Sequence, residues 1–459
     1  MNFSYLRREP GFYRRVFTLA LPVVLQNLIT TSLGFMDTFM VGLVGQEQMS
    51  AVTVANVPIY IIQLIVFGLQ SGSRVLISQF WGRGDRKSIN RVMGIGFFVA
   101  GGISTLCALT MGLFPRQVLM LITDNARLVE LGTSYIRIVG FSYILNSLSS
   151  IYIGMQQSIE NPRFGMTVFA ISTVCNTVGN YILIFGKLGL PALGITGAAI
   201  ATFSSRVVEF VISLVYALRC KQMPLMPACI LRPGKATFRS FVKFSTPVLL
   251  NETLWGTGTS LYTVIMGHMA GSTDLISAYT VAGNIDKMVT VAIFGVAAAV
   301  IVGKEVGMGG KNAYPIGQAL TFVAFCTGFG VAIAEQLLFW LVLKPHVLPL
   351  FSMTAASASL CVTMMICYSI SAPLHAFATT GIVGVLRGGG DVRIAMLIDI
   401  LPLWCFTLPL LVLLGLVLHA PIAIFCFIMA TESALKVPFG LHRIRSGKWI
   451  HDVTQDLNA

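Results

Sequence analysis

The stretch Val75-Leu-Ile-Ser-Gln-Phe-Trp-Gly-Arg-Gly84 has a counterpart 225 residues later, Val300-Ile-Val-Gly-Lys-Glu-Val-Gly-Met-Gly309. At the same offset, Pro22-Val-Val-Leu matches Pro247-Val-Leu-Leu, and Gly42 matches Gly267. Several matches at one offset indicate that the chain consists of two related halves. If both halves cross a membrane in the same direction, they form a parallel repeat related by an axis along the membrane normal, an arrangement typical of transporters.

The composition places this repeat in a membrane. The 459 residues are 55% hydrophobic and only 11% charged, whereas soluble domains carry about 45–50% apolar and about 25% charged residues. This balance excludes a soluble globule and a disordered chain. The nine cysteines form no close pairs, so we interpret them as small apolar core residues rather than a disulfide framework.

Twelve apolar segments are long enough to span the hydrocarbon core, which takes about 20 helical residues. The sequence therefore predicts an all-α polytopic membrane protein with six spans in each of two pseudo-symmetric bundles. The first segment is too long for a cleavable signal peptide. The predicted spans cover residues 16–41, 52–79, 92–114, 132–156, 165–186, 194–217, 240–268, 275–302, 314–343, 356–386, 394–417 and 420–441.

The distribution of Lys and Arg predicts the orientation of these spans. With the N-terminus inside, the inner segments hold 22 of these residues and the outer segments only 4. This asymmetry predicts that both termini face the cytoplasm. It also explains the net charge of +13 without a nucleic-acid partner. The predicted organisation is a cytoplasmic N-terminal segment (1–15), an N-terminal lobe (16–218), a cytoplasmic linker (219–239), a C-terminal lobe (240–441) and a cytoplasmic tail (442–459).

Two carboxylates inside predicted spans are the first functional candidates. Asp37 and Glu252 have no opposite charge three or four residues away on their own helices. A carboxylate inside a membrane is costly and usually functional. Each could exchange a proton or bind Na⁺, and the structural alternative is a hydrogen bond to another helix.

Other polar residues inside the spans have both structural and functional interpretations. Asn176 and Asn180 are i,i+4 and share a helix face, so they either join helices or line a polar path. Asp286 lies in the middle of its span, and Asp399 either takes part in coupling or anchors the turn at 388–390. Arg206 with Glu209, and Glu432 with Lys436, have spacings that predict ion pairs within one helix. The candidate coupling-ion or substrate residues are Asp37, Asn176, Asn180, Glu252 and Asp286, followed by Asp399, Thr202, Gln26 and Trp255.

Four motifs, taken in order on twelve spans, resemble the multidrug and toxic compound extrusion (MATE) transporters of the MOP superfamily. The resemblance covers about residues 16–441. The motifs are Leu21-Pro22 with Met36-Asp-Thr-x-Met-Val-Gly42; Ser78-Gln-Phe-Trp-Gly-Arg-Gly84; Gly194-Ile-Thr-Gly-Ala-Ala-Ile-Ala-Thr202; and Leu386-Arg-Gly-Gly-Gly-Asp391.

The resemblance implies two six-helix bundles in a V and efflux of amphipathic, often cationic compounds driven by inward H⁺ or Na⁺. It implies that Asp37 couples proton movement to helix bending, with Asn176 and Asn180 as polar positions of the same site. It also implies a Na⁺ site near Glu252. Some members carry a further aspartate on span 10, but Pro373–Thr380 contains no acid here, so Asp286 is the candidate to replace it.

Two other functions compete with an antiporter. A flippase for lipid-linked precursors would need unpaired Arg or Lys in its cavity, yet Arg206 and Lys436 have acidic neighbours. A membrane-embedded enzyme is disfavoured because the chain has no zinc-protease, nucleophile-elbow or P-loop motif. We expect no cofactor and no structural metal, only a coupling H⁺ or Na⁺. The expected partners are small molecules and the lipid bilayer, not nucleic acid, for a monomer in the bacterial cytoplasmic (inner) membrane.

Overall fold

The computed structural model describes residues 10–269, 271–293, 295–347 and 354–455. The described residues are almost entirely helical and contain no β-strand beyond one isolated bridge between Gly390 and Ile450. The first half of the chain forms α1 (Phe12–Gly42), α2 (Gln46–Arg83), α3 (Arg86–Leu113), α4 (Pro115–Met120), α5 (Ala126–Ser158), α6 (Pro162–Phe185), α7 (Gly194–Arg219), α8 (Pro227–Leu231) and α9 (Lys235–Gly267).

The described residues of the second half are helical too, and four of their segments are π-helical. Segments η2 (Phe339–Val347) and η4 (Ala378–Leu386) continue α12 and α13, and η5 (Pro402–Thr407) and η6 (Leu413–Val417) follow α14 and α15. The α-helices are α10 (Ser272–Thr290), α11 (Gly295–Gly307), α12 (Ala313–Leu338), α13 (Ala355–Phe377), α14 (Val392–Leu401), α15 (Leu408–Val412) and α16 (Ile422–Arg445).

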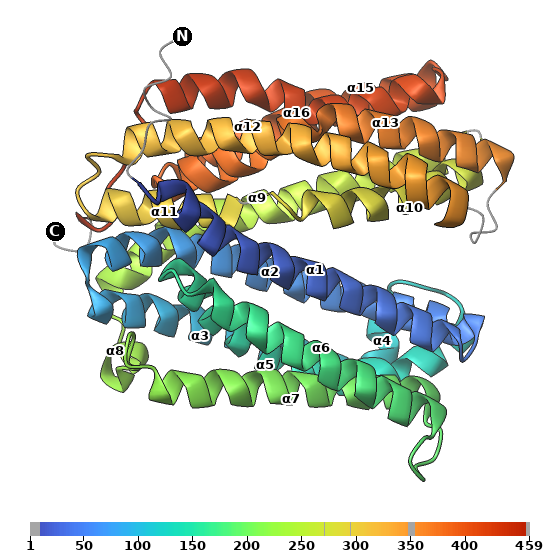
Figure 1. Cartoon of the computed structure of the whole chain (residues 1–459). Helices are drawn as coiled ribbons and strands as arrows, with labels where there is room; N and C mark the ends of the chain where they lie inside the picture. Colours follow the sequence, from blue (N-terminus) through green and yellow to red (C-terminus); the bar gives the residue numbers. More distant parts are fainter. Residues whose placement is uncertain (1–9, 270, 294, 348–353, 456–459) are drawn as a thin grey trace. The chain divides into compact units, whose positions relative to one another are not determined.

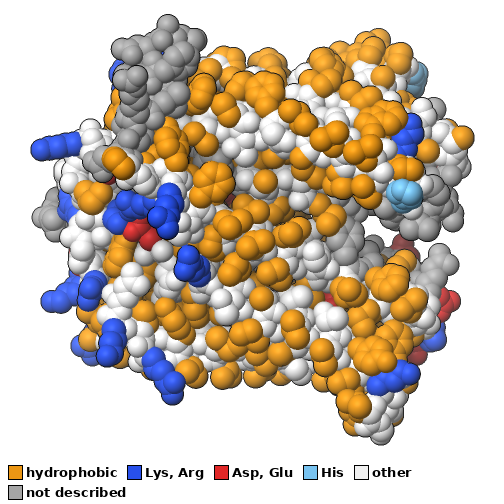
Figure 2. Space-filling view, viewed as in Figure 1, with side chains coloured by type: hydrophobic (Ala, Val, Ile, Leu, Met, Phe, Trp, Pro, Cys, Tyr) orange, Lys and Arg blue, Asp and Glu red, His pale blue; other side chains and the backbone are white. Residues whose placement is uncertain are grey.

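Eleven helical stretches among the described residues are long and apolar enough to cross a membrane. They correspond to eleven of the twelve predicted spans. The twelfth, 240–268, corresponds to α9, which has 33 residues but carries Lys243, Asn251 and Glu252 and is not among the eleven. These stretches confirm an all-α, multi-pass membrane protein. On the face shown in Figure 2, hydrophobic side chains cover most of the surface, and most of the visible Lys and Arg side chains lie toward the left of the view.

Internal contacts divide the chain into two compact units. The N-terminal unit comprises residues 25–249, and the C-terminal unit comprises residues 10–24 and 250–455 of the described chain. The division falls inside α1 and inside α9, whereas the predicted lobes, 16–218 and 240–441, are separated by the linker. The first turns of α1 and the first turns of α9 therefore each pack in the unit formed mainly by the other half of the sequence.

Each unit has its own core. In the N-terminal unit, α5 packs against α2, α3 and α7, and α6 lies along α7 (Figure 1). In the C-terminal unit, α13 packs against α10, α12 and α16. Here Val16 and Leu19 from α1 join a cluster that contains Ala298, Ile382 and Trp449.

The repeat predicted from the sequence extends to individual hydrogen bonds. Gly84 and Gly309 occupy equivalent positions, and their φ angles of 74° and 111° lie in the region that favours glycine. Both follow the end of a helix, where such a residue redirects the chain and satisfies free carbonyls. The equivalent backbone bonds run from Asp85 N to Phe80 O at 3.0 Å and from Gly310 N to Glu305 O at 3.0 Å.

Gly328 lets α12 and α13 approach closely. A Cβ atom at this position would lie 2.4 Å from Pro373 Cα, whereas a Cβ at Gly330 on the same helix would meet nothing within 4 Å. We expect Gly328→Ala to lower the free energy of unfolding by about 1–3 kcal/mol, because overpacking displaces backbone. Unfolding of the purified protein in detergent measures this loss, with Gly330→Ala as the matched control. Equal stability of the two variants would contradict the prediction.

Candidate functional site

Four polar side chains from three helices meet in the N-terminal unit. Asn180 Nδ2 donates to Asp37 Oδ1 at 2.6 Å and to Asn176 Oδ1 at 3.0 Å. Asn176 Nδ2 donates to Thr202 Oγ1 at 3.3 Å. Asn176 and Asn180 are each only 1% exposed, and Asp37 is half-buried. We call these residues of α1, α6 and α7 the N-site.

Local sequence explains why the N-site residues meet. Asn176 and Asn180 are one turn apart on α6, so both amides point from the same helix face. Small residues let α7 approach that face, since a Cβ at Gly179 would lie 3.1 Å from Ala201 Cβ. The close packing of α6 and α7 therefore brings Thr202, next to Ala201, within reach of Asn176.

The Asp37 carboxylate accepts its hydrogen bond from an amide rather than from a cation. Among the described residues, no Lys or Arg lies within ion-pair distance of it. Arg206, the basic residue of the same region, is paired with Glu209 at 2.7 Å, as the i,i+3 spacing predicts. Asn146 Nδ2 also donates to Glu209 Oε1 at 3.1 Å. The charge of Asp37 is therefore not neutralised by an ion pair.

The side chains of the N-site are of the kind that bind a proton or a hard cation. Its potential ligands are all oxygen atoms, which hard cations prefer. The buried Oδ1 of Asn180 has no hydrogen-bond partner, so it is available to a bound ion. A protonated Asp37 and an ion-bound Asp37 would both be accommodated by these side chains.

Gln26 belongs to a different polar contact. Gln157 Nε2 donates to Gln26 Oε1 at 3.1 Å, and an Arg74 guanidinium nitrogen donates to Gln157 Oε1 at 3.3 Å. Gln26 is 9% exposed. In the part of the chain that the structure describes, no hydrogen bond joins this trio to Asp37, so the structure does not bring Gln26 into the N-site.

In the C-terminal unit, Glu252 is paired rather than free. The Arg387 guanidinium lies 2.6 Å from Glu252 Oε1, and Arg387 is 2% exposed. Arg387 directly follows η4, just after the end of the predicted span 356–386, and its side chain is buried. Glu252 thus has the interhelical partner that its own helix lacks.

Asp399 joins the same charged network. Lys436 Nζ lies 2.7 Å from Asp399 Oδ1 and 2.6 Å from Glu432 Oε1, so the predicted pair within α16 is confirmed and extended. Asn251 Nδ2 donates to Asp399 Oδ2 at 2.8 Å. Tyr262 donates its hydroxyl to Glu432 Oε2 at 2.7 Å. Asp399 is therefore held by α9 and α16, in addition to its position near the glycine-rich turn.

Asp286 and Trp255 lie apart from this network. Asp286 is half-buried on α10 and Trp255 is 38% exposed. Among the described residues, no hydrogen bond or ion pair links Asp286 to Glu252. Its acidic neighbour is instead Glu335 on α12, which our sequence analysis passes over. The sequence does contain the feature that points to Glu335, because this residue is a carboxylate inside the predicted span 314–343.

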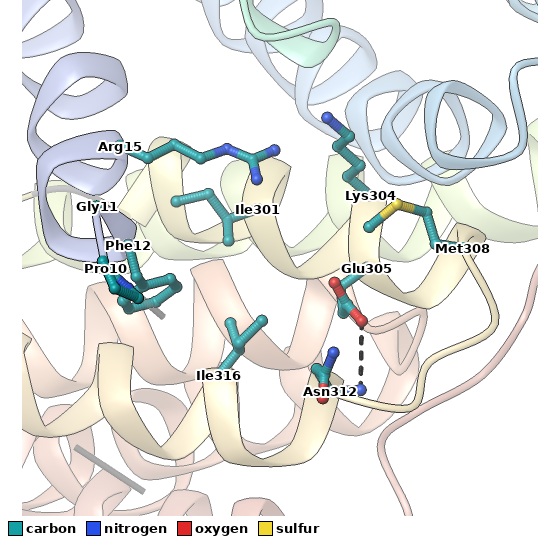
Figure 3. A pocket seen from close by; sticks show the side chains of 10 residues that line it. All are labelled: Pro10, Gly11, Phe12, Arg15, Ile301, Lys304, Glu305, Met308, Asn312 and Ile316. Carbon is teal, nitrogen blue, oxygen red and sulfur yellow. Dashed lines mark hydrogen bonds between the residues drawn. The ribbon is translucent and has the colours of Figure 1, made fainter. Parts of the chain in front are cut away.

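Two cavities lie within single units. In the N-terminal unit, a cavity of about 240 Å³ has an apolar and aromatic lining that includes Phe97, Tyr152 and Phe210. In the C-terminal unit, a cavity of about 420 Å³ lies between the first turn of α1 and the end of α11 (Figure 3). Its lining mixes Arg15 and Lys304 with Glu305, so it has no single charge preference, and it contains none of the candidate carboxylates.

Comparisons with known proteins agree with this architecture. The family model described as MatE matches residues 22–182. The multidrug resistance protein MdtK of Edwardsiella ictaluri is 26% identical over 88% of both chains, and the probable multidrug resistance protein NorM of Thermotoga maritima is 24% identical over 67% of both. A solved MATE structure in complex with MaL6 has a TM-score of 0.84 at 17% identity, covering 97% of this chain and 99% of that one. A MOP superfamily transporter of Pyrococcus furiosus has a TM-score of 0.83 at 16% identity, covering 97% and 98%.

Proposed function

Because this chain belongs to the MATE family, we propose that it is a secondary antiporter that exports amphipathic, often cationic organic compounds in exchange for inward H⁺ or Na⁺. Two relatives that carry the words multidrug resistance in their names support export of drug-like compounds. The observation that carries the ion exchange is the N-site, where Asp37 accepts a hydrogen bond from Asn180 and has no ion pair among the described residues.

Exchange follows from competition at one carboxylate. An ionised Asp37 attracts a cationic compound or Na⁺, whereas a protonated Asp37 is neutral and attracts neither. Binding of the coupling ion therefore weakens binding of the cargo by the same factor as the cargo weakens binding of the ion. An inward ion gradient then drives release of the cargo outside.

The N-site supports this role better than Glu252 does. Arg387 already neutralises Glu252 at 2.6 Å, so a Na⁺ ion at Glu252 would have to compete with a buried guanidinium. We therefore assign the principal coupling role to Asp37. Asn176, Asn180 and Thr202 orient it, and Asp399 with Lys436 supports the C-terminal unit.

The paired bases argue against the flippase alternative. Arg206, Arg387 and Lys436 each contact a carboxylate within 2.7 Å, so these three cations are not available for the phosphates of a lipid-linked precursor. We further propose that the chain works as a monomer in a bacterial inner membrane with both termini in the cytoplasm, where the positive-inside rule places its basic helix ends.

Ethidium efflux from energised cells tests the proposal. Cells that express the chain are expected to export ethidium faster than cells that express an Asp37→Asn variant at the same membrane level. If H⁺ is the coupling ion, a protonophore stops export and removal of Na⁺ does not. If Na⁺ is the coupling ion, removal of Na⁺ stops export. Export that survives both treatments together would refute ion-coupled exchange.

A further inference from the structure

Glu335 is a fully buried carboxyl inside a membrane-spanning stretch. It lies on α12 within the apolar stretch Ala313–His346 and is 0% exposed. Its helix packs against α13 and α10. The next turn of the chain places Phe339, also 0% exposed, in the apolar core of the C-terminal unit. The surroundings therefore offer little solvation for a negative charge.

Among the described residues of this unit, three buried carboxyls and the half-buried Glu252 lie beside cations, and Glu335 does not. Glu252, Asp391, Asp399 and Glu432 each lie 2.6 or 2.7 Å from a Lys or Arg nitrogen. Within the described ranges, no basic side chain lies at ion-pair distance from Glu335. Its Oε1 is buried and has no hydrogen-bond partner. An ionised Glu335 would therefore be an uncompensated charge, which costs several kcal/mol or more in such an environment.

An acidic neighbour makes ionisation of Glu335 less favourable still. Asp286 on α10 interacts electrostatically with Glu335. The same aspartate interacts with Tyr279 on its own helix and with Tyr368 on α13. From α16, Glu432 is already paired with Lys436. The basic residue of this part of α10 is Lys287, which is exposed and acts on its neighbour Asp286. The other groups named here are acidic or neutral, and two neighbouring carboxylates resist being ionised together.

The hydrogen bonds of Ser369 are compatible with a proton on Glu335. Ser369 Oγ lies 2.9 Å from Glu335 Oε2 and 3.0 Å from Met365 O, and it accepts a hydrogen bond from Gln336 Nε2 at 2.7 Å. The serine has one hydroxyl proton for two acceptor oxygens. Helical serines commonly donate to the carbonyl four residues earlier, here Met365 O. When the serine proton is directed at Met365 O, a protonated Glu335 can donate to Ser369 Oγ; when it is directed at Glu335 Oε2, the carboxyl accepts it.

We propose that Glu335 holds a proton in this conformation and forms, with Asp286 and Ser369, a second proton-binding site in the C-terminal unit. The proposal deepens the proposed function, because an exchange cycle could then draw on one proton site in each unit.

Infrared spectroscopy of the purified full-length protein in lipid nanodiscs tests this site without cargo or gradient. The carbonyl stretch of a protonated carboxyl is expected in an Asp37→Asn background, and Glu335→Gln should remove it. Glu252→Gln is the matched control, because that carboxylate is ion-paired and its replacement should leave the band. Ser369→Ala should shift the band without removing it, since the hydroxyl that accepts from Glu335 is lost.

Two results would overturn the proposal. One is the same band with and without Glu335→Gln. The other is a band that vanishes when Na⁺ replaces choline at constant pH, which would make Glu335 a metal-ion ligand. Neither depends on ethidium export, so failure of this site and failure of the proposed function are distinguishable. Because Gln has the shape of a protonated Glu, the variant is expected to fold, and its thermal unfolding checks this.

Discussion

Asp37→Asn is expected to reduce ion-coupled export to the level of cells that lack the protein. The replacement keeps a hydrogen-bonding side chain of the same size beside Asn180, which donates to Asp37 at 2.6 Å. It removes the one group of the N-site that changes charge. Without that change, the ion and the cargo no longer exclude each other, so the gradient cannot drive release. Initial rates of ethidium efflux at matched membrane expression measure the effect.

The matched control removes a carboxylate outside the membrane core. Glu130 lies at the start of α5, is 64% exposed and contacts Arg127 at 2.9 Å. Exposed pairs of this kind contribute about 0–1 kcal/mol, so Glu130→Gln should export like the wild type. Substantial export by Asp37→Asn, in protein that still unfolds at the wild-type temperature, would move the coupling role elsewhere in the chain.

Lys436→Met is expected to lower the free energy of unfolding by about 3–5 kcal/mol, because breaking a buried ion pair leaves an uncompensated charge. Lys436 is 3% exposed and contacts both Asp399 and Glu432. Among the described residues, its loss leaves two buried carboxylates with the Arg387 guanidinium, 3.9 Å from Asp399, as the remaining cation at ion-pair distance. Unfolding of the purified protein by sodium dodecyl sulfate in mixed micelles measures the change.

A second substitution separates charge from packing. Glu432→Gln added to Lys436→Met should recover part of the lost stability, since one unbalanced carboxylate is removed while its hydrogen bond from Tyr262 can remain. Lys287→Met, an exposed position on α10, should cost little. If the double variant is no more stable than the single one, Lys436 acts through its packing and not through its charge.

Local sequence patterns determined the fold class and part of the site. Apolar runs determine which segments enter the membrane, because each residue contributes to transfer from water independently of its distant partners. The offset of 225 residues between Gly84 and Gly309 predicted a repeat, and equivalent backbone hydrogen bonds occur at both positions. The i,i+4 spacing of Asn176 and Asn180 placed both amides on one face, since helix geometry alone sets that relation.

Only the tertiary structure decided which charges meet. Asp37 lies 143 residues from Asn180, and Glu252 lies 135 residues from Arg387, and no helix periodicity encodes such pairings. The charge of the carboxylate is therefore treated differently in the two units. Asp37 has the amide of Asn180 as its partner, whereas Glu252 is neutralised by Arg387. Glu335, passed over in the sequence, is distinguished only by the absence of a cation across the α12–α13 contact among the described residues. A carboxylate inside a membrane is recognisable from sequence, but whether it is paired or free to bind an ion depends on packing between distant segments.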